Sequence, residues 1–193
     1  MSKRYLETIK SLDGELFHLK YHQWRLERAL GREDTHNLSA LLSPSKKGLY
    51  RCRVVYNHND ISVEYIPYFK RQVHSLKLVY NDTIEYEKKY ENRDSLNALF
   101  KQKEGADDII IIKNSLITDT SIANIAFYDG EVWVTPKSPL LEGTTRKRFL
   151  DLGKIVERDI RVEEISSFKK LALMNAMIDF DIIAEENIED IIC

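Results

Sequence analysis

One stretch of the sequence places polar side chains in an apolar run just before a predicted strand. Residues 116–124 read LITDTSIAN, and the polar members include Asp119, Thr120, Ser121 and Asn124. Polar groups in such a run must be hydrogen-bonded or put to use, because burying them unpaired is costly. The stretch is therefore the first candidate for a site. The next residues, AFYDGEVWVT, predict a hairpin that turns at Asp129-Gly130.

A second candidate is the sequence Gly143-Thr144-Thr145-Arg146, which opens a predicted helix. Free backbone N–H groups, two hydroxyls and the positive end of the helix dipole together suit an anion, and phosphate best. Simple N-capping by Thr144 or Thr145 is the alternative reading. Asn175-Ala176, where a predicted strand ends in a loop, is a weaker anion contact.

Arg25 lies in a predicted helix beside Trp24. Arginine in this setting is most often a solvated side chain whose stem covers apolar surface. It can equally hold a phosphate through two parallel hydrogen bonds if the helix faces a site.

Other reactive residue types form no recognisable site. His18 and His22 are four apart, but a strand-to-helix change is expected between them, and no glutamate follows His18 as in a zinc-protease motif. Asp179 and Asp181 have no identifiable partner ligands. Cys52 lies in a strand pattern and is expected to be a packed thiol. We predict no metal site.

Composition bounds the class of protein. The 193 residues carry a net charge of −2, with acidic and basic residues interspersed, so no charged field points to nucleic acid. Two cysteines do not make a disulfide framework. The N-terminus lacks an apolar signal core and no apolar run reaches spanning length, so we expect a cytoplasmic protein without membrane contact.

The predicted elements indicate an α/β or α+β protein. The first part reads as strands, a helix that stops at Gly31, and an antiparallel meander of LYRCRVVY, ISVEYIPY and HSLKLVY. The second part alternates strands and helices, including a helix over DSLNALFKQK with Asp94 as N-cap. We expect two subdomains, residues 1–85 and 86–193.

Taken together, these motifs resemble the class IV aminotransferase family, the fold-type IV enzymes that use pyridoxal phosphate. The family pattern T-E-x-x-x-x-N, then xDGxxxTP, then L-L-x-G-(I/T)-T-R is matched by TDTSIAN, YDGEVWVTP and LLEGTTR. Upstream, LETIKSLDGELFHLKYHQWRL is similar to the family's FETI…H-x-x-R-L, with His22, Arg25 and Leu26 in the motif positions. The resemblance implies a small N-terminal α/β domain and a larger C-terminal β-barrel-like domain.

The resemblance also implies where the catalytic lysine lies. Lyase members of the family often carry K-x-x-N-R before the helix that follows the domain boundary, and KYENR matches it with Lys89 as the lysine. Lys88 is its neighbour, and Lys77 is a distant second choice. The alternative is that Lys89 is an ordinary charged lysine on a loop.

The remaining roles follow from the same resemblance. Lys89 would carry pyridoxal 5'-phosphate and move protons at the substrate carbon. Asp119, where the family has Glu, would accept the proton of the pyridinium nitrogen and keep the ring an electron sink. The other expected cofactor contacts are Arg25, Gly143, Thr144, Thr145 and the loop pair Asn175 and Ala176 at the phosphate, with Ile122 along the cofactor face.

The expected function is a lyase that converts 4-amino-4-deoxychorismate into 4-aminobenzoate and pyruvate, a step toward folate. The alternatives are a class IV aminotransferase and a non-catalytic cofactor-binding protein; Asp119 and a short N-terminus prompt the latter. Asp94, five residues after Lys89 where branched-chain enzymes have Tyr, weighs against that subgroup. We expect a small-molecule substrate and a homodimer. Substrate carboxylates could be held by Arg51, Arg53, Arg71 or Arg93.

Overall fold

The computed structural model describes residues 3–31, 36–44, 47–185 and 188–192. The chain forms two compact units, one of residues 1–70 and 88–92, the other of residues 71–87 and 93–193. This division differs from the single boundary expected after residue 85, because the chain enters the second unit early and returns to the first for five residues. The expected α/β (α+β) class with two subdomains is confirmed.

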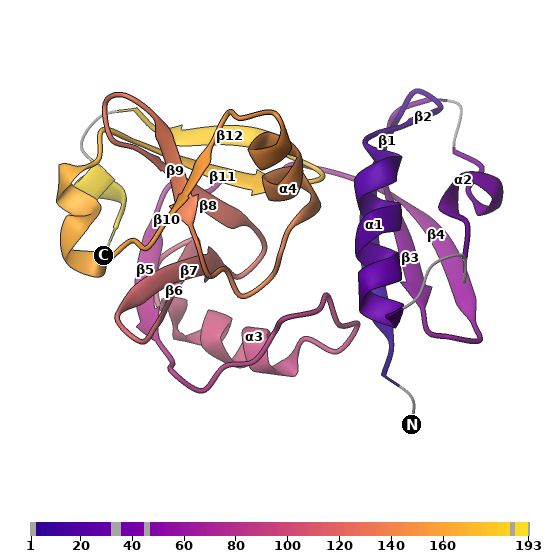
Figure 1. Ribbon diagram of the computed structural model, residues 1–193, viewed down its shortest axis with the longest axis horizontal. Helices are drawn as coiled ribbons and strands as arrows, with labels where there is room; N and C mark the ends of the chain where they lie inside the picture. The colour runs from indigo at the N-terminus through magenta and orange to yellow at the C-terminus, as the bar shows by residue number, and fades with distance from the viewer. Residues whose placement is uncertain (1–2, 32–35, 45–46, 186–187, 193) are drawn as a thin grey trace. The chain divides into compact units, whose positions relative to one another are not determined.

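The first unit is a four-stranded antiparallel sheet with strand order β2-β1-β3-β4 (Figure 1). Its strands are β1 (Tyr5–Leu12), β2 (Glu15–Leu16), β3 (Leu49–Tyr56) and β4 (Ile61–Pro67), and its helices are α1 (Leu19–Leu30) and α2 (Leu38–Leu41). Helix α1 ends as predicted at Gly31, which adopts a left-handed φ of 71° and donates its N–H to Glu27 O.

Helix α1 covers one face of this sheet. Burial alternates strictly along β1, so that every second side chain faces the helix. Ile9 and Cys52 are fully buried there and pack with Leu26 of the helix. The side chains at the intervening positions of β1 and β3 therefore lie on the opposite face.

The second unit contains an eight-stranded mixed sheet. Its strands are β5 (Leu76–Tyr80), β6 (Asp108–Lys113), β7 (Leu116–Thr120), β8 (Asn124–Tyr128), β9 (Trp133–Pro136), β10 (Val156–Arg158), β11 (Lys170–Asn175) and β12 (Asp179–Ala184). Its α-helices are α3 (Asp94–Phe100) and α4 (Thr144–Asp151). Asp94 occupies the first helical position and Arg93 is the N-cap, which corrects the predicted cap by one residue.

Strand β5 corrects a second prediction. The sequence HSLKLVY was expected to complete a meander with β3 and β4, but β5 belongs to the second unit and pairs in parallel with β6. Strand propensity in a short apolar run does not specify its partner. The continuous apolar run of β6 suits a strand with a neighbour on each side, because five of its six residues are buried.

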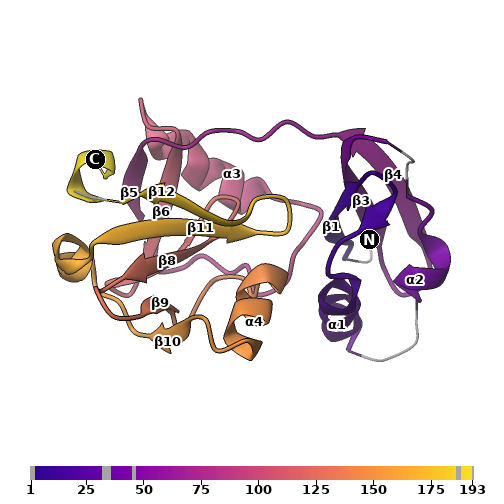
Figure 2. The same ribbon diagram turned by 90° about the horizontal axis from the view of Figure 1, so that it is seen from above.

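The sheet divides at β8, and this division positions the candidate site. Strand β8 pairs with β11 over five residues on one side. On the other side it pairs with β7 at Asn124 and with β9 at Phe127 and Tyr128. Beside this point the turn between β11 and β12 lies next to α4 (Figure 2).

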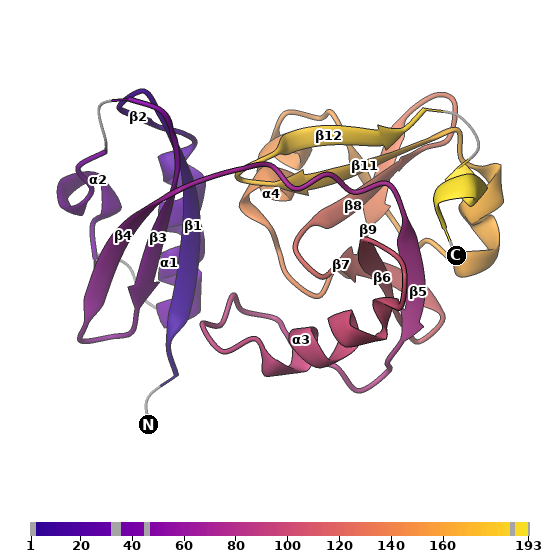
Figure 3. The same ribbon diagram turned by 180° about the vertical axis from the view of Figure 1, so that it is seen from behind.

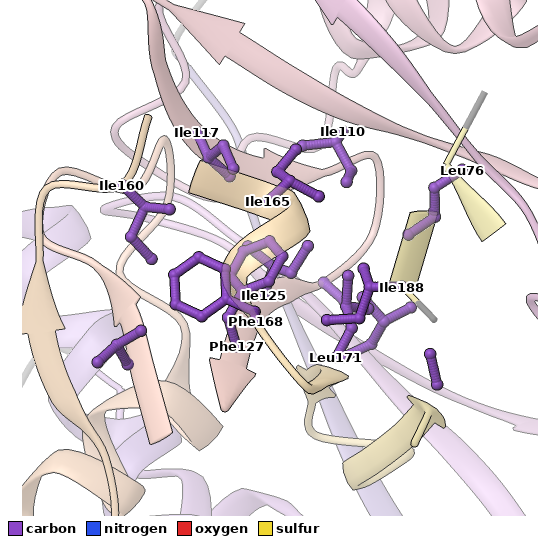
Figure 4. Packing of buried hydrophobic residues seen from close by; sticks show 14 of the residues in the cluster. Leu76, Ile110, Ile117, Ile125, Phe127, Ile160, Ile165, Phe168, Leu171 and Ile188 are labelled. Atoms are coloured by element: carbon purple, nitrogen blue, oxygen red, sulfur yellow. The ribbon is translucent and has the colours of Figure 1, made fainter. Parts of the chain in front are cut away.

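A large apolar cluster holds the second unit together (Figure 4). Phe127 of β8 stacks at a tilt on Phe168, with ring centroids 4.9 Å apart. Fully buried isoleucines at positions 110, 117, 125 and 160 surround the two rings. This packing makes β7 and β8 a rigid support for the polar residues at their junction. No helix within the described ranges is long and apolar enough to cross a membrane.

Candidate active site

The polar stretch of the sequence forms a tight turn between β7 and β8. Asp119 is the Cα partner of Asn124, so the two side chains lie beside each other across the strand pair. Within the turn, the hydroxyl of Thr120 donates to Ala123 O at 3.1 Å and accepts the Ala123 N–H at 3.0 Å. Thr120 therefore satisfies its hydroxyl within the turn, and Asp119 and Asn124 hydrogen-bond each other.

The Asp119 carboxylate accepts a hydrogen bond on each oxygen. The Asn124 amide donates to Oδ1 at 2.7 Å, and the Leu141 backbone N–H donates to Oδ2 at 2.9 Å. Asn124 also donates to Leu141 O at 2.8 Å, which closes a ring of three residues. A carboxylate has about four acceptor positions, so these two bonds leave room for a third donor.

Burial dominates the protonation of Asp119. The residue is 5% exposed, and burial raises the pKa of its carboxyl to about 6, although the Leu141 N–H, the Asn124 amide and the Arg146 charge oppose the rise. At neutral pH the carboxylate is thus ionised yet poorly solvated. A cationic N–H donor placed against it would find an unusually strong acceptor.

Asn124 also fixes the start of α4. A β-carbon built on Gly143 would lie 1.9 Å from Asn124 Oδ1, so only glycine fits at the N-cap of this helix. The helix begins with Thr144, whose neighbours Thr145 and Arg146 are also buried. The turn at Asp119 and the helix N-terminus are therefore in direct contact through Asn124.

The N-terminus of α4 has the properties of an anion site. The first backbone bond of the helix runs from Lys147 N to Gly143 O, so the N–H groups before it have no helical acceptor. Thr144 and Thr145 do not cap the helix, and among the residues that the structure describes their hydroxyls make no hydrogen bond. Arg146 instead donates to Pro136 O and pairs with Glu157 at 2.6 Å, which anchors the helix.

In the first unit, Arg25 is held by a buried carboxylate. Glu7 is fully buried and accepts Arg25 Nε at 2.8 Å and an Arg25 Nη at 2.6 Å. The pKa of Glu7 would be raised by burial, but Arg25 and His22 lower it to about 2. Glu7 is thus ionised, and His22 donates its Nδ1 proton to it at 2.6 Å. Burial lowers the pKa of His22 against the opposing effect of Glu7, so the ring is neutral at pH 7.

Lys89 lies beside β1 in the same unit. Its carbonyl accepts the Leu6 N–H at 2.8 Å, and Tyr90 forms a bridge with Tyr5. The charge of Lys89 is among the influences that lower the His22 pKa, so the lysine is near the Glu7–His22–Arg25 cluster. The ammonium of Lys88 has a different partner, since it donates a hydrogen bond to Ala29 O at 2.9 Å. Lys77 is ion-paired with Glu104.

The other predicted contacts surround the β7–β8 turn. Ile122 is 39% exposed, and its carbonyl accepts the Asn175 amide at 3.4 Å. Asn175 Oδ1 accepts the N–H groups of Met177 and Ile178, so this side chain also builds the β11–β12 turn that contains Ala176. An Arg93 Nη also donates to Ser121 O at 2.6 Å. Two side chains therefore hydrogen-bond carbonyls of the turn, and the Ile122 side chain remains accessible.

The structure gathers the predicted residues into two groups. Asp119, Ile122, Gly143, Thr144, Thr145, Asn175 and Ala176 belong to the second unit, and Arg25 and Lys89 belong to the first. Sequence reasoning missed the role of Glu7. A signal was present, since Glu7 stands between Tyr5 and Ile9 on the buried side of an alternating strand.

Of the residues set aside earlier, His22 joins the first group, because it hydrogen-bonds the Glu7 carboxylate that holds Arg25. Across residues 3–31, 36–44, 47–185 and 188–192, no group of three or more His, Cys, Asp or Glu side chains could hold a metal. Cys52 is buried in the core, and burial raises the pKa of its thiol, as expected of a packed cysteine. Cys193 lies outside the described residues.

Comparisons with known proteins agree with these motifs. The family model for amino-transferase class IV matches residues 94–184. An uncharacterised protein of Haemophilus influenzae is 38% identical over 180 residues, which are 89% of this chain and 96% of that protein. A crystal structure from Haemophilus somnus, provisionally named a 4-amino-4-deoxychorismate lyase, shares 35% identity at a TM-score of 0.82 and covers 92% of this chain and 97% of its own.

A more distant structure shares the fold alone. A hypothetical aminotransferase from Mycobacterium tuberculosis, solved with α-ketoglutarate and PMP bound, is 14% identical at a TM-score of 0.76, with 94% of this chain and 80% of that chain covered. The motif order predicted from sequence, the two-unit fold and the full-length relatives thus agree. This chain belongs to the class IV aminotransferase family, whose members are enzymes.

Proposed function

We propose that this protein is a pyridoxal-phosphate-dependent lyase that converts 4-amino-4-deoxychorismate into 4-aminobenzoate and pyruvate. One observation carries the proposal: a buried carboxylate at Asp119 is tied through Asn124 to a helix N-terminus suited to phosphate. The ring nitrogen and the phosphate are two separate polar groups of this cofactor. A linked acceptor and anion site are what these two groups require.

The residues present fit such a cofactor. The N–H groups and hydroxyls of Thr144 and Thr145 would hold the phosphate, and Arg25, oriented by Glu7, would add charge-assisted hydrogen bonds. Asp119 would accept the ring N–H, and the exposed Ile122 side chain would pack on the ring. Asp119 is one methylene shorter than the family's Glu, and its carboxylate is set by Asn124 and Leu141 rather than by side-chain length.

The reaction requires proton transfer at the substrate carbon. When bound, pyridoxal phosphate supplies an electron sink conjugated with the substrate nitrogen. The Lys89 amine would hold the cofactor and then, once displaced by the substrate amine, remove the ring proton as a general base. Pyruvate leaves as the ring becomes aromatic, so no second amino acceptor is needed.

The lyase reading is supported by two features. The sequence Lys89-Tyr90-Glu91-Asn92-Arg93 has the K-x-x-N-R form of the lyase members, and the Haemophilus somnus relative bears the lyase name. An aminotransferase is the second candidate, because the family model and the Mycobacterium tuberculosis neighbour carry that name. In that case Lys89 would move a proton between the substrate carbon and the cofactor. We also propose a cytoplasmic homodimer in folate precursor synthesis.

Product analysis separates these candidates. Protein loaded with pyridoxal phosphate is incubated with 4-amino-4-deoxychorismate, and pyruvate and 4-aminobenzoate are quantified. The lyase produces both in equal amounts without an added keto acid. Absence of pyruvate, with conversion of the cofactor to its amine form on addition of an amino acid, would favour the aminotransferase. Failure to bind the cofactor would reject both and leave a non-catalytic protein.

A further inference from the structure

Three segments of the second unit are joined to one another in a closed ring of contacts. The β7–β8 turn contacts the start of α4 through Asn124. It contacts the β11–β12 turn through Asn175, whose amide donates to Ile122 O at 3.4 Å. The third contact joins α4 to the β11–β12 turn directly, because Arg148 donates to the Asp179 carboxylate and forms an ion pair with it. Figure 3 shows this turn beside α4.

Asp179 has a backbone conformation that glycine adopts most readily. It begins β12 directly after the turn, and its φ is 60°, in the left-handed region. Glycine adopts this region without steric cost, whereas a β-carbon is crowded there by the carbonyl that follows it. The backbone alone therefore favours glycine at position 179. The part of the aspartate that the fold uses is its carboxylate.

The ion pair between Arg148 and Asp179 is only partly buried. The two side chains are 13% and 52% exposed, and an ion pair with one exposed partner adds little to the free energy of unfolding. Apolar contact instead docks α4 on β12, since the ring centroids of Phe149 and Phe180 are 5.0 Å apart. The ion pair is therefore placed to set how α4 and the turn meet, rather than whether they meet.

The β11–β12 turn projects past the strand pairing that fixes β11. The pairing of β8 with β11 ends at Met174, the Cα partner of Asn124. Beyond this point the Asn175 amide contacts the β7–β8 turn at 3.4 Å, which is long for a hydrogen bond and hence weak. The bond between Arg148 and Asp179 is charge-assisted and is therefore the stronger of these two links.

The two segments that the ion pair joins carry the expected phosphate contacts. Thr144 and Thr145 begin α4, where the N–H groups have no helical acceptor. In the β11–β12 turn, Asn175 Oδ1 accepts two N–H groups. The N–H of Ala176 makes no hydrogen bond to any residue that the structure describes. One phosphate can bridge both segments only at a narrow spacing, because such hydrogen bonds require about 2.7–3.2 Å between the heavy atoms.

We infer that Arg148 and Asp179 are positioning residues of the cofactor site. Their ion pair holds the β11–β12 turn at the spacing from the N-terminus of α4 at which both segments bind one phosphate. This inference rests on the proposed use of pyridoxal phosphate. Neither side chain contacts the cofactor, since the pair acts through the backbone groups of the two segments. Loss of the pair weakens the contacts of the phosphate and leaves those of the ring unchanged.

Two ligands that differ in the phosphate alone test this role. Absorbance titration of the cofactor-free protein gives dissociation constants for pyridoxal 5'-phosphate and for pyridoxal, and their ratio measures the phosphate preference. We expect this preference to fall at least about tenfold in Arg148→Gln and in Asp179→Asn, the effect of one lost charge-assisted hydrogen bond. The affinity for pyridoxal stays at the wild-type value. Arg148→Lys keeps the charge and should retain part of the preference.

A neighbouring ion pair on α4 is the matched control for charge. Lys147 and Asp151 pair within the helix, and Lys147 is one residue closer to the helix N-terminus than Arg148 is. A long-range effect of charge on the phosphate would therefore be at least as large in Lys147→Gln as in Arg148→Gln. We expect Lys147→Gln and Asp151→Asn to keep the phosphate preference within about threefold of the wild type, because water and salt screen exposed charges.

Asp179→Gly separates positioning from folding. Glycine relieves the left-handed strain while the carboxylate is lost, so the urea midpoint should not fall below that of Asp179→Asn. The phosphate preference should nevertheless fall as far as in Asp179→Asn. The double variant Arg148→Gln/Asp179→Asn should lose no more than either single variant, because both changes remove the same contact.

Each contrary result has a defined meaning. A wild-type phosphate preference in both Arg148→Gln and Asp179→Asn would overturn the inference. An equal loss of pyridoxal affinity would also overturn it, because the pair would then support the whole site, and an equal loss in Lys147→Gln would reduce it to a charge effect. If the wild type binds pyridoxal 5'-phosphate but releases no pyruvate from 4-amino-4-deoxychorismate, the lyase proposal fails and the positioning role stands. If the wild type does not bind the cofactor, both fail.

Discussion

Asn124 Oδ1 occupies the space that a β-carbon of residue 143 would need, and Gly143 is the residue that leaves it open. The amide on the same side chain donates to Asp119 and to Leu141 O. One asparagine therefore sets the distance between a buried carboxylate and a helix N-terminus. The Asp119 carboxylate and the N-terminus of α4 could not shift independently, because β7 and β8 are supported by the apolar core.

Gly143→Ala should damage both stability and cofactor binding. The added β-carbon would lie 1.9 Å from Asn124 Oδ1, so the asparagine or the helix start must move. Overpacking of this kind costs about 1–3 kcal/mol, measurable by urea unfolding. Gly105→Ala is the control, since nothing lies within 4 Å of its β-carbon position. Equal unfolding midpoints for the two variants would contradict the tight contact.

Glu7→Gln should destabilise the first unit strongly. The change leaves the Arg25 guanidinium buried without its carboxylate, and losing one partner of a buried pair costs about 3–5 kcal/mol. Glu91→Gln is the control, because Glu91 pairs with Arg53 and Arg4 at a partly exposed position. Such pairs contribute up to about 1 kcal/mol.

The effect of Glu7 should also depend on pH in a defined direction. Its pKa is lowered from the ordinary 4.5 to about 2, so its contribution is complete above pH 4.5 and is lost as the pH falls through about 2. Urea unfolding of the wild type and Glu7→Gln at several pH values measures the difference. A difference that does not shrink below pH 4 would mean that Glu7 is not ionised in the fold.

Asp119 should show the opposite pH dependence. Its pKa is raised from 3.8 to about 6, so the folded protein binds a proton that the unfolded chain releases between these values. The wild type should therefore lose about 2–3 kcal/mol relative to Asp119→Asn as pH rises from about 4 to 7. Unfolding of both proteins without cofactor gives this difference directly. A constant difference across the range would place the Asp119 pKa at its ordinary value.

The same variant tests the role of the carboxylate. Asp119→Asn removes the charge that would hold the ring nitrogen protonated, while the phosphate contacts at α4 are kept. We expect the cofactor to remain bound and the rate of product release to fall strongly, as for loss of an electrostatic contact at the reacting group. Wild-type turnover in Asp119→Asn would contradict the pyridinium role.

Local patterns predicted most elements but not their long-range partners. The helix that ends at Gly31 and the hairpin at Asp129-Gly130 depend on short-range signals, a left-handed cap and a tight turn, and both are present. Strand β5 was assigned correctly as a strand and wrongly to a meander. Its parallel pairing with β6 joins segments that lie about thirty residues apart, and no local sequence pattern indicates which strand β5 pairs with.

In the candidate site, too, contacts between residues close in sequence were predictable and contacts between distant residues were not. Asp119 and Asn124 are close in sequence, and the need to satisfy polar groups in an apolar run indicated that they interact. Glu7 and Arg25 are eighteen residues apart on different elements, and the pair becomes evident once α1 packs on β1. The distance from Asn124 to Gly143 depends likewise on the packed fold.

Lys89 and Lys88 are adjacent, and their contacts predict different outcomes when each is replaced. Lys88→Ala loses the hydrogen bond to Ala29 O at the end of α1, so we expect lower stability with cofactor attachment intact. Lys89→Ala should fold normally and lose covalent attachment. Borohydride treatment of pyridoxal-phosphate-loaded protein, followed by peptide mass spectrometry, reads the attachment site directly. Modification found on Lys88 in the wild type, or kept in Lys89→Ala, would assign the reactive amine to another lysine. Because the Lys88 ammonium already donates to Ala29 O, we expect the attachment on Lys89, whose carbonyl accepts the Leu6 N–H beside β1.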